Sequence, residues 1–288
     1  MMTRRQSPPG ATSIVDAHVH FWDPASFEYP WLRAVPALGR SFVPRDYAAG
    51  SAPVDGLVVV EANSSPADAA REAQWFERLA EHDARIAGIV AFVDLTEPRT
   101  RTATLTALAQ LRRVKGVRQN IQGQPAGFCL DPVFVDGLRM VAHQGLSFDV
   151  CATHDQLADV VELVTRCPDA RFALDHCGKP PIRERGLDPW RRHIAALAAR
   201  DNVWCKISGL VTEADPRAWT AADLLPYAAH VVECFGPARI MYGSDWPVLS
   251  LAADYGDWFD FTMRLTEPWT SDERRAFYRD TAVHFYRL

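Results

Sequence analysis

The feature that most constrains the fold of this chain is a series of short apolar runs separated by segments with helical spacing. The runs are rich in β-branched and aromatic residues and are continuously apolar rather than alternating, a pattern typical of parallel strands that are buried on both faces. Eight such runs occur, at residues 13–21, 54–62, 85–95, 114–123, 146–154, 171–178, 202–210 and 239–247.

The segments between many of these runs have the apolar spacing of amphipathic helices. They include residues 65–83, 131–145, 154–169 and 188–201. Three of them open with the pairs Ser65-Pro66, Asp131-Pro132 and Asp188-Pro189, which are typical of a helix N-cap and first turn.

Strands that alternate with helices eight times over about 250 residues predict an α/β fold, specifically a (β/α)₈ TIM barrel in a single domain. An open doubly wound sheet is the alternative, but it favours a glycine-rich phosphate loop after the first strand. Here the first strand ends in "DAHVHFWDP" instead. We expect a disordered lead-in over residues 1–13 and the barrel over 14–288. An insertion over about 22–53, rich in aromatic residues and proline, is expected to lean over the barrel mouth.

Composition narrows the range of partners. A net charge of -5 and a pI near 6.0 give no sign of a nucleic-acid-binding patch. No apolar run reaches the roughly 18 residues of a membrane helix, and the start "MMTRRQSPPG" lacks the apolar region of a secretory signal. Six scattered cysteines suit buried thiols in a reducing compartment. We therefore expect a cytoplasmic protein with a small-molecule substrate; the number of chains in its assembly stays open, and a homodimer is compatible with the sequence.

Ionisable residues recur where the expected strands end. Active sites of TIM barrels lie at the carboxyl ends of the strands, so these residues are candidates for a site. His18 and His20 are two apart on the first strand and should face the same side. The later candidates are Glu61, Arg118, His154, Asp175-His176, Lys206 and Asp245. Charges at buried strand ends are costly unless they are paired, metal-bound or catalytic.

Several of these candidates have a structural alternative. His154 stands beside Asp155 at a strand-to-helix junction, where either residue could cap the helix. Glu61 and Lys206 could form buried ion pairs, and Arg118 a salt bridge at the barrel bottom. Asp245, in "GSDWP" at the end of the last run, is the candidate with the fewest structural explanations.

Five segments in order resemble the amidohydrolase superfamily: "VDAHVHFWDP…YPWL" (15–32), "GVRQNIQ" (116–122), "LDHCGKP" (174–180), "KISGL" (206–210) and "YGSDWPV" (242–248). The nearest branch is the amidohydrolase-related one, described as TIM-barrel metal-dependent hydrolases, which includes sugar lactonases such as L-fuconolactonase. The resemblance runs over about residues 14–250, and the five segments together are specific to the branch rather than to a substrate.

The resemblance implies roles for individual residues. His18 and His20 match the metal-binding pair of the first strand. Asp245 matches the aspartate that binds the metal and takes a proton from the attacking water, and His176 matches the histidine that polarises the scissile group. The fourth strand lacks a clear carboxylated-lysine pattern, which disfavours a binuclear centre. The ligand from the fifth strand would have to be His154.

These roles predict a hydrolase that opens a sugar lactone or a similar cyclic ester with an activated water. One divalent ion, with Zn²⁺ favoured by the ligand types, would be held by His18, His20, His154 and Asp245. Because some relatives in this branch act without metal, the metal requirement stays open. The substrate-binding candidates are Arg118, Gln119, Asn120, Trp22, Trp246, Glu61 and Lys206. A decarboxylase or an amide hydrolase on the same barrel is the alternative, and a non-catalytic ligand-binding barrel is a third reading.

Overall fold

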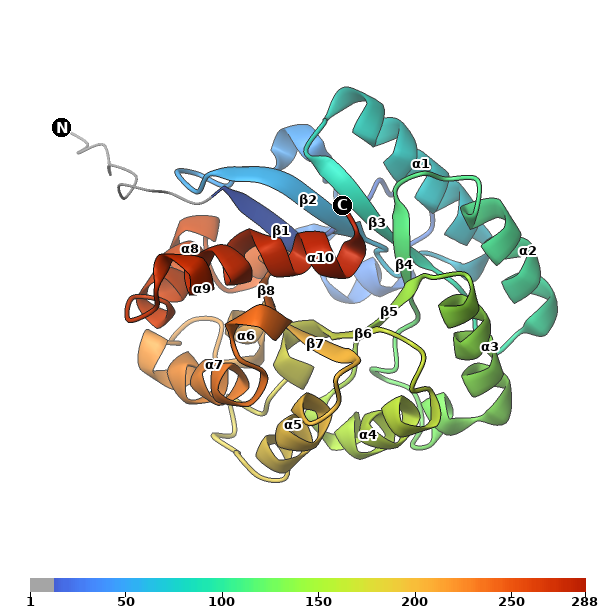
Figure 1. The fold of residues 1–288 in the computed structure, drawn as a ribbon. Coiled ribbons are helices and arrows are strands. Elements are labelled where there is room, and N and C mark those ends of the chain that lie inside the picture. Colours follow the sequence, from blue (N-terminus) through green and yellow to red (C-terminus); the bar gives the residue numbers. More distant parts are fainter. Residues whose placement is uncertain (1–12) are drawn as a thin grey trace.

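Eight parallel strands form a nearly closed barrel in a computed structural model that describes residues 13–288 (Figure 1). The strands follow one another around the barrel in chain order, which confirms the predicted fold. They are β1 (Ile14–Val19), β2 (Val54–Val60), β3 (Ile86–Phe92), β4 (Val114–Arg118), β5 (Ser147–Val150), β6 (Phe172–Leu174), β7 (Val203–Ile207) and β8 (Ile240–Tyr242). Of the expected lead-in only Ser13 is described, and the rest lies outside the described residues.

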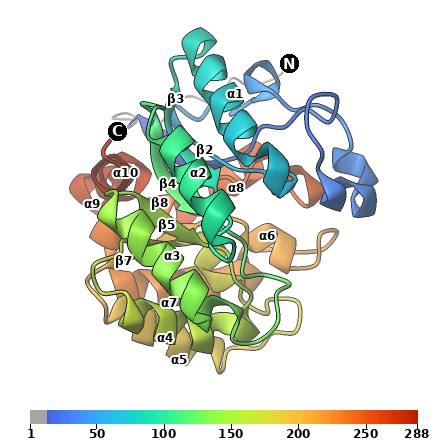
Figure 2. The ribbon, with the colours of Figure 1, turned by 90° about the vertical axis from the view of Figure 1, so that its right-hand side faces the viewer.

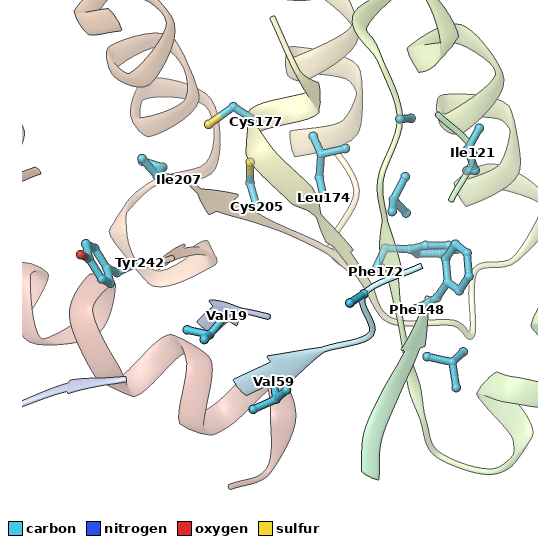
Figure 3. Close-up of a cluster of buried hydrophobic side chains, with 14 of the residues drawn as sticks. Val19, Val59, Ile121, Phe148, Phe172, Leu174, Cys177, Cys205, Ile207 and Tyr242 are labelled. Carbon is cyan, nitrogen blue, oxygen red and sulfur yellow. The ribbon is translucent and has the colours of Figure 1, made fainter. Parts of the chain in front are cut away.

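The strands are apolar on both faces because each face packs against a separate core. Val15, Ala17 and Val58 belong to the cluster inside the barrel. The opposite faces pack against the helices in a larger cluster, part of which is seen in Figure 3, where Phe148 and Phe172 lie edge to face with ring centroids 6.4 Å apart. Burial on both sides explains why the sequence shows continuous apolar runs instead of alternation.

Helices surround the strands (Figures 1 and 2). They are α1 (Ala69–His82), α2 (Pro98–Leu108), α3 (Pro132–His143), α4 (Leu157–Arg166), α5 (Trp190–Ala198), α6 (Leu210–Glu213), α7 (Ala221–Phe235), α8 (Tyr255–Leu265), α9 (Ser271–Arg275) and α10 (Thr281–Tyr286). None of the helices within residues 13–288 is long and apolar enough to cross a membrane.

Of the three predicted helix starts, one follows the expected capping pattern. The Asp131 carboxylate accepts a hydrogen bond from the N–H of Val133, as a cap should. Ser65 precedes a short 3-10 turn (Pro66–Asp68) and makes no side-chain cap. The prediction for Asp188 is wrong: α5 begins at Trp190 after Pro189, and the exposed Asp188 faces Arg192 instead.

The two ends of the barrel are closed differently. Helix α10 covers the amino end, where Phe285 and Tyr286 join the inner cluster and the Tyr286 hydroxyl donates to Asp149 at 2.7 Å. At the opposite end lies the segment between β1 and β2, the blue part of Figure 2. It contains three short 3-10 turns, Pro30–Ala34, Pro36–Leu38 and Pro44–Asp46. This segment therefore covers the end of the barrel where the polar strand termini gather.

Candidate active site

His18 and His20 point into the barrel because the alternation of inward-facing and outward-facing side chains shifts part-way along β1. Val15 and Ala17 face the inner cluster, whereas Val19 packs in the outer one. The pairing register with β2 shifts between Asp16 and Val19, at the same place. This irregularity brings His18 and His20 to the interior, where their Nε2 atoms lie 3.1 Å apart.

The other ring nitrogen of each histidine has a fixed partner. His20 Nδ1 lies 2.9 Å from the carbonyl oxygen of Val60, so this nitrogen carries the proton and Nε2 is left free to accept. His18 Nδ1 lies 3.1 Å from Lys206 Nζ and 3.2 Å from Asp175 Oδ1. Burial lowers the pKa of His18 well below its usual value despite Asp175, and the neighbouring Lys206 lowers it further, so the ring is neutral.

A network of buried ions lies beneath the histidines. Lys206, on β7, contacts Asp149 and Asp175, while Arg118, on β4, donates to Glu61 at 2.6 Å and to Asp175 at 3.3 Å. Burial lowers the pKa of Lys206, but the two carboxylates more than offset this effect and raise the pKa above its usual value. Glu61 and Lys206, both proposed from sequence as substrate contacts, are thus fully buried and ion-paired.

Asp245 lies just beyond β8 in a strained backbone conformation. Its φ of 61° is in the left-handed region, which a non-glycine residue adopts only when its surroundings hold it there. The restraint comes from β1: the N–H of Asp245 donates to the carbonyl of His18 at 2.8 Å, and the N–H of Ser244 donates to Asp16 Oδ1 at 2.8 Å. The carboxyl ends of the first and last strands are therefore tied directly to each other.

Asp16 is a residue of this site that the sequence reasoning missed. Its second oxygen accepts hydrogen bonds from the hydroxyls of Tyr47, in the β1–β2 segment, and Tyr255, at the start of α8. Burial outweighs these hydrogen bonds and raises the pKa of Asp16 to about 6. Its position two residues before the first histidine was the available signal, because an acidic residue within a buried strand needs dedicated partners.

The Asp245 carboxylate is surrounded by imidazole rings. Its Oδ1 lies 3.4 Å from His20 Nε2, 3.8 Å from His18 Nε2 and 4.0 Å from His176 Nε2. Burial raises the pKa of Asp245, but His176, His20 and Lys179 outweigh this effect and hold it below its usual value. The carboxylate is therefore ionised at neutral pH and can accept a proton.

His176 is placed by a tight turn after β6. The backbone of His176, Cys177 and Lys179 is left-handed, and Ser208, after β7, lies 2.9 Å from His176 Nδ1 through its hydroxyl. Gly209 follows Ser208, and a Cβ at Gly209 would lie 2.5 Å from His176 Nδ1. Glycine at 209 therefore makes room for the ring. Burial lowers the pKa of His176 well below its usual value, against the opposing effect of Asp245, so this ring too is neutral.

A cavity of about 310 Å³ opens beside these groups. Of the residues proposed from sequence, six line it: His20, Trp22, Arg118, Asn120, His176 and Asp245. Four further lining residues carry polar or reactive groups that were not proposed: Asn63, Gln122, Cys151 and Lys179. Lys179 donates to Glu213, on α6, at 2.7 Å.

Some proposed contacts lie elsewhere. Gln119 is buried outside this cavity, where its side chain bonds the N–H of Leu95 and the carboxylate of Asp94. Trp246 does not line the cavity either; its ring packs edge to face against Phe42. These two side chains shape the surroundings of the cavity rather than its wall.

His154 is not brought to the site. Strand β5 ends at Val150, so Cys151 is the first residue beyond it, while His154 begins a separate 3-10 turn (His154–Gln156) and is partly exposed. Within residues 13–288, the groups of side chains that could share a metal ion are His18, His176 and Asp245, and Cys151, Asp175 and His176. His154, predicted from the sequence as a ligand, belongs to neither group, because it follows the end of β5 by four residues and lies in a separate turn.

The donor set fits one divalent ion. Two histidine ligands at tetrahedral zinc have nitrogens about 3.3 Å apart, close to the separation of the two Nε2 atoms. The hydrogen bond from His20 Nδ1 to a backbone carbonyl is the usual outer support of a metal-ligating histidine. The tautomer of His18 depends on which neighbour its Nδ1 bonds. A hydrogen bond from Nδ1–H to Asp175 would leave Nε2 free to bind a metal, whereas a hydrogen bond from Lys206 to Nδ1 would put the ring proton on Nε2.

Comparisons with known proteins identify the family of this chain. The model of the amidohydrolase family matches residues 15–288. An L-fucono-1,5-lactonase from Burkholderia ambifaria is 32% identical and one from Burkholderia multivorans 34% identical, the alignments covering 96% and 95% of this chain and 96% of each relative. The crystal structure of an amidohydrolase from Burkholderia multivorans with bound zinc superposes with a TM-score of 0.87 at 32% identity, covering 96% of this chain and 99% of that one. The chain belongs to the amidohydrolase family.

Proposed function

We propose that this amidohydrolase opens a sugar lactone, with Asp245 as the general base. The observation that carries the proposal is the ionised, buried carboxylate of Asp245 with imidazole rings on three sides, at the edge of a cavity of about 310 Å³. The similarity to two L-fucono-1,5-lactonases over nearly the whole chain supports the choice of a lactone as substrate.

The reaction begins with a water molecule held by Asp245. The carboxylate takes one proton from this water while the water oxygen attacks the lactone carbonyl carbon. The product of this step is a tetrahedral oxyanion. When the Ser208 hydroxyl donates to His176 Nδ1, the neutral ring carries its proton on Nε2 and can donate to that oxyanion. Arg118 and Lys179 add positive charge to the cavity wall.

Collapse of the intermediate breaks the bond between the carbonyl carbon and the ring oxygen. The proton held by Asp245 passes to this leaving oxygen and regenerates the carboxylate for the next turnover. The product is an open-chain hydroxy acid, which ionises and releases one proton. Lys179, held in place by Glu213, can pair with the new carboxylate.

A divalent ion would be held by His18 and Asp245, with His176 and His20 within reach as further ligands, and would polarise the lactone carbonyl or the water when bound. All the proton transfers above are made by side chains of this chain. The proposal therefore does not depend on which ion, if any, the enzyme uses.

Lactone hydrolysis and the alternative decarboxylation differ in what they release. We expect L-fucono-1,5-lactone or a related aldonolactone to release one acid equivalent per turnover in a weakly buffered pH-indicator assay. A panel of aldonolactones and aromatic carboxylates, followed for acid and for CO₂, separates the two. Release of CO₂ from a carboxylate, with no lactone opened above the spontaneous rate, would contradict the proposal.

A further inference from the structure

A second cavity adjoins the catalytic one at the carboxyl end of the barrel. It has a volume of about 370 Å³ and shares four wall residues with the catalytic cavity: Trp31, Asn63, Asn120 and Gln122. We call this second cavity the annex. Small-molecule sites commonly have volumes of about 300–1,000 Å³, so the catalytic cavity alone is at the lower limit and the two together can hold a larger ligand.

The lining of the annex is chemically unlike that of the catalytic cavity. It has no histidine, lysine, arginine or cysteine among residues 13–288, and its one ionisable group is Asp94. The Asp94 carboxylate is already bonded by Thr96 and by the side-chain amide of Gln119. The annex can therefore bind but has no group suited to proton transfer, and its charge disfavours an anionic ligand.

Neutral hydrogen-bonding groups dominate its wall. Side-chain amides come from Asn63, Gln119, Asn120, Gln122 and Gln124, and hydroxyls come from Ser64 and Ser65. Amides can both donate to and accept from hydroxyl groups. This combination suits a neutral ligand with many hydroxyls.

Two residues at the boundary between the cavities support a ligand that crosses it. The side-chain oxygen of Asn120 is buried without a hydrogen-bond partner among the described residues, although buried polar atoms are usually paired. Trp31 is half-buried, and its indole N–H donates to the carbonyl of Ala62 at 2.7 Å, which fixes the orientation of the ring. A fixed aromatic face beside an unpaired amide oxygen can hold the apolar side of a sugar ring while a hydroxyl of the ring is bonded.

We infer that the annex is a subsite for a neutral polyhydroxylated substituent, such as a second sugar ring, carried by the lactone whose carbonyl reaches Asp245. This inference rests on the proposed lactonase function and extends it to glycosylated aldonolactones. The lactone ring would occupy the catalytic cavity, and the substituent would pass Asn120 and Trp31 into the annex.

The test compares four lactones on the full-length enzyme. L-Fucono-1,5-lactone and D-glucono-1,5-lactone probe the catalytic cavity alone; cellobiono-1,5-lactone and melibiono-1,5-lactone add a sugar at O4 and at O6. The variant Gln124→Trp fills the annex from an exposed position outside the catalytic cavity. Gln110→Trp, at an exposed glutamine outside both cavities, is the matched control.

We expect at least one glycosylated lactone to be opened as efficiently as D-glucono-1,5-lactone or better. Gln124→Trp should lower kcat/KM for that lactone about tenfold and leave the two monosaccharide lactones unchanged, whereas Gln110→Trp should change none of them. Hydrolysis of a monosaccharide lactone with neither glycosylated lactone opened, or an equal effect of Gln124→Trp on all substrates, would overturn the annex and leave the lactonase function standing. If none of the four is opened above the spontaneous rate, the proposed function fails for this class of lactone, and the annex inference fails with it.

Discussion

The backbone N–H of Asp245 donates to the carbonyl oxygen of His18 at 2.8 Å, so the last strand's carboxylate takes its position from the first strand. Between β1 and β8 the backbone pairing is limited to a bridge at Val19 and Trp246. The geometry of the site therefore depends on a few hydrogen bonds between the ends of the first and last strands. Single substitutions can test these contacts separately.

Replacing Asp245 by asparagine should remove the general base without changing the volume of the side chain. We expect kcat for lactone opening to fall by about 10²–10⁴-fold, because an amide cannot take the proton from water. Asp201→Asn, at an exposed aspartate in a turn, is the control and should keep full activity. Near-normal turnover by Asp245→Asn in the pH-indicator assay would exclude this residue as the base.

Asp16→Asn tests whether the buried carboxylate positions Asp245. Its oxygens accept from Ser244, Tyr47 and Tyr255, and an amide can replace only part of this set. We expect kcat to fall about 10–100-fold with KM little changed, in the range found for outer-shell support of active-site groups. Tyr255→Phe removes one donor and should give a smaller loss. A loss of kcat accompanied by a lower melting temperature and a raised KM would point to a general packing defect instead.

Removal of metal should leave most of the hydrolytic activity. Lys206 Nζ lies 3.1 Å from His18 Nδ1 and can donate a hydrogen bond to it, which puts the ring proton of His18 on Nε2. That proton points toward His20 Nε2, so the two rings can hydrogen-bond each other without an ion between them. The measurement is metal content and lactone hydrolysis before and after chelation. Loss of activity on chelation, with recovery on adding Zn²⁺, would contradict this expectation and favour the tautomer set by Asp175.

The buried Glu72, on α1, should make the protein less stable at alkaline pH. Burial, and then repulsion by Glu61, raises the pKa of Glu72 from 4.5 to about 8. A raised pKa means that the stabilising contribution is complete below pH 4.5 and is lost as pH rises through about 8. Glu72→Gln stays neutral, so its free energy of unfolding should exceed that of the wild type by up to a few kcal/mol at pH 8.5 and match it near pH 4.5. Chemical denaturation at both pH values checks this, and a difference that does not change with pH would count against it.

The fold and the centre of the site were predictable because they depend on patterns that repeat. Eight apolar runs define eight strands, and strand ends in a TIM barrel converge, which is why His18, His20, His176 and Asp245 could be grouped from sequence. The family segments "LDHCGKP" and "KISGL" also have a physical explanation: one forms the left-handed turn at His176, and the other supplies Ser208 and the space at Gly209.

The parts of the site that the sequence could not predict depend on single-residue register. His154 and Cys151 are three residues apart, and which one faces the cavity is decided by where β5 ends. Ion-pair partners could not be predicted either, since Lys206 contacts Asp149 on β5 and Asp175 in the turn after β6. Whether a buried charge contacts substrate or another charge depends on side-chain positions that no local pattern specifies.

The hydroxyl of Tyr47 joins the segment that covers the site to the carboxylate that ties the first and last strands together. Exchange of residues 22–53 to accept a new substrate would therefore also alter the support of the proposed catalytic base, Asp245. Chimeras with an exchanged segment should be more active when tyrosine is kept at position 47. A chimera that lacks this tyrosine should bind its ligand but turn it over slowly.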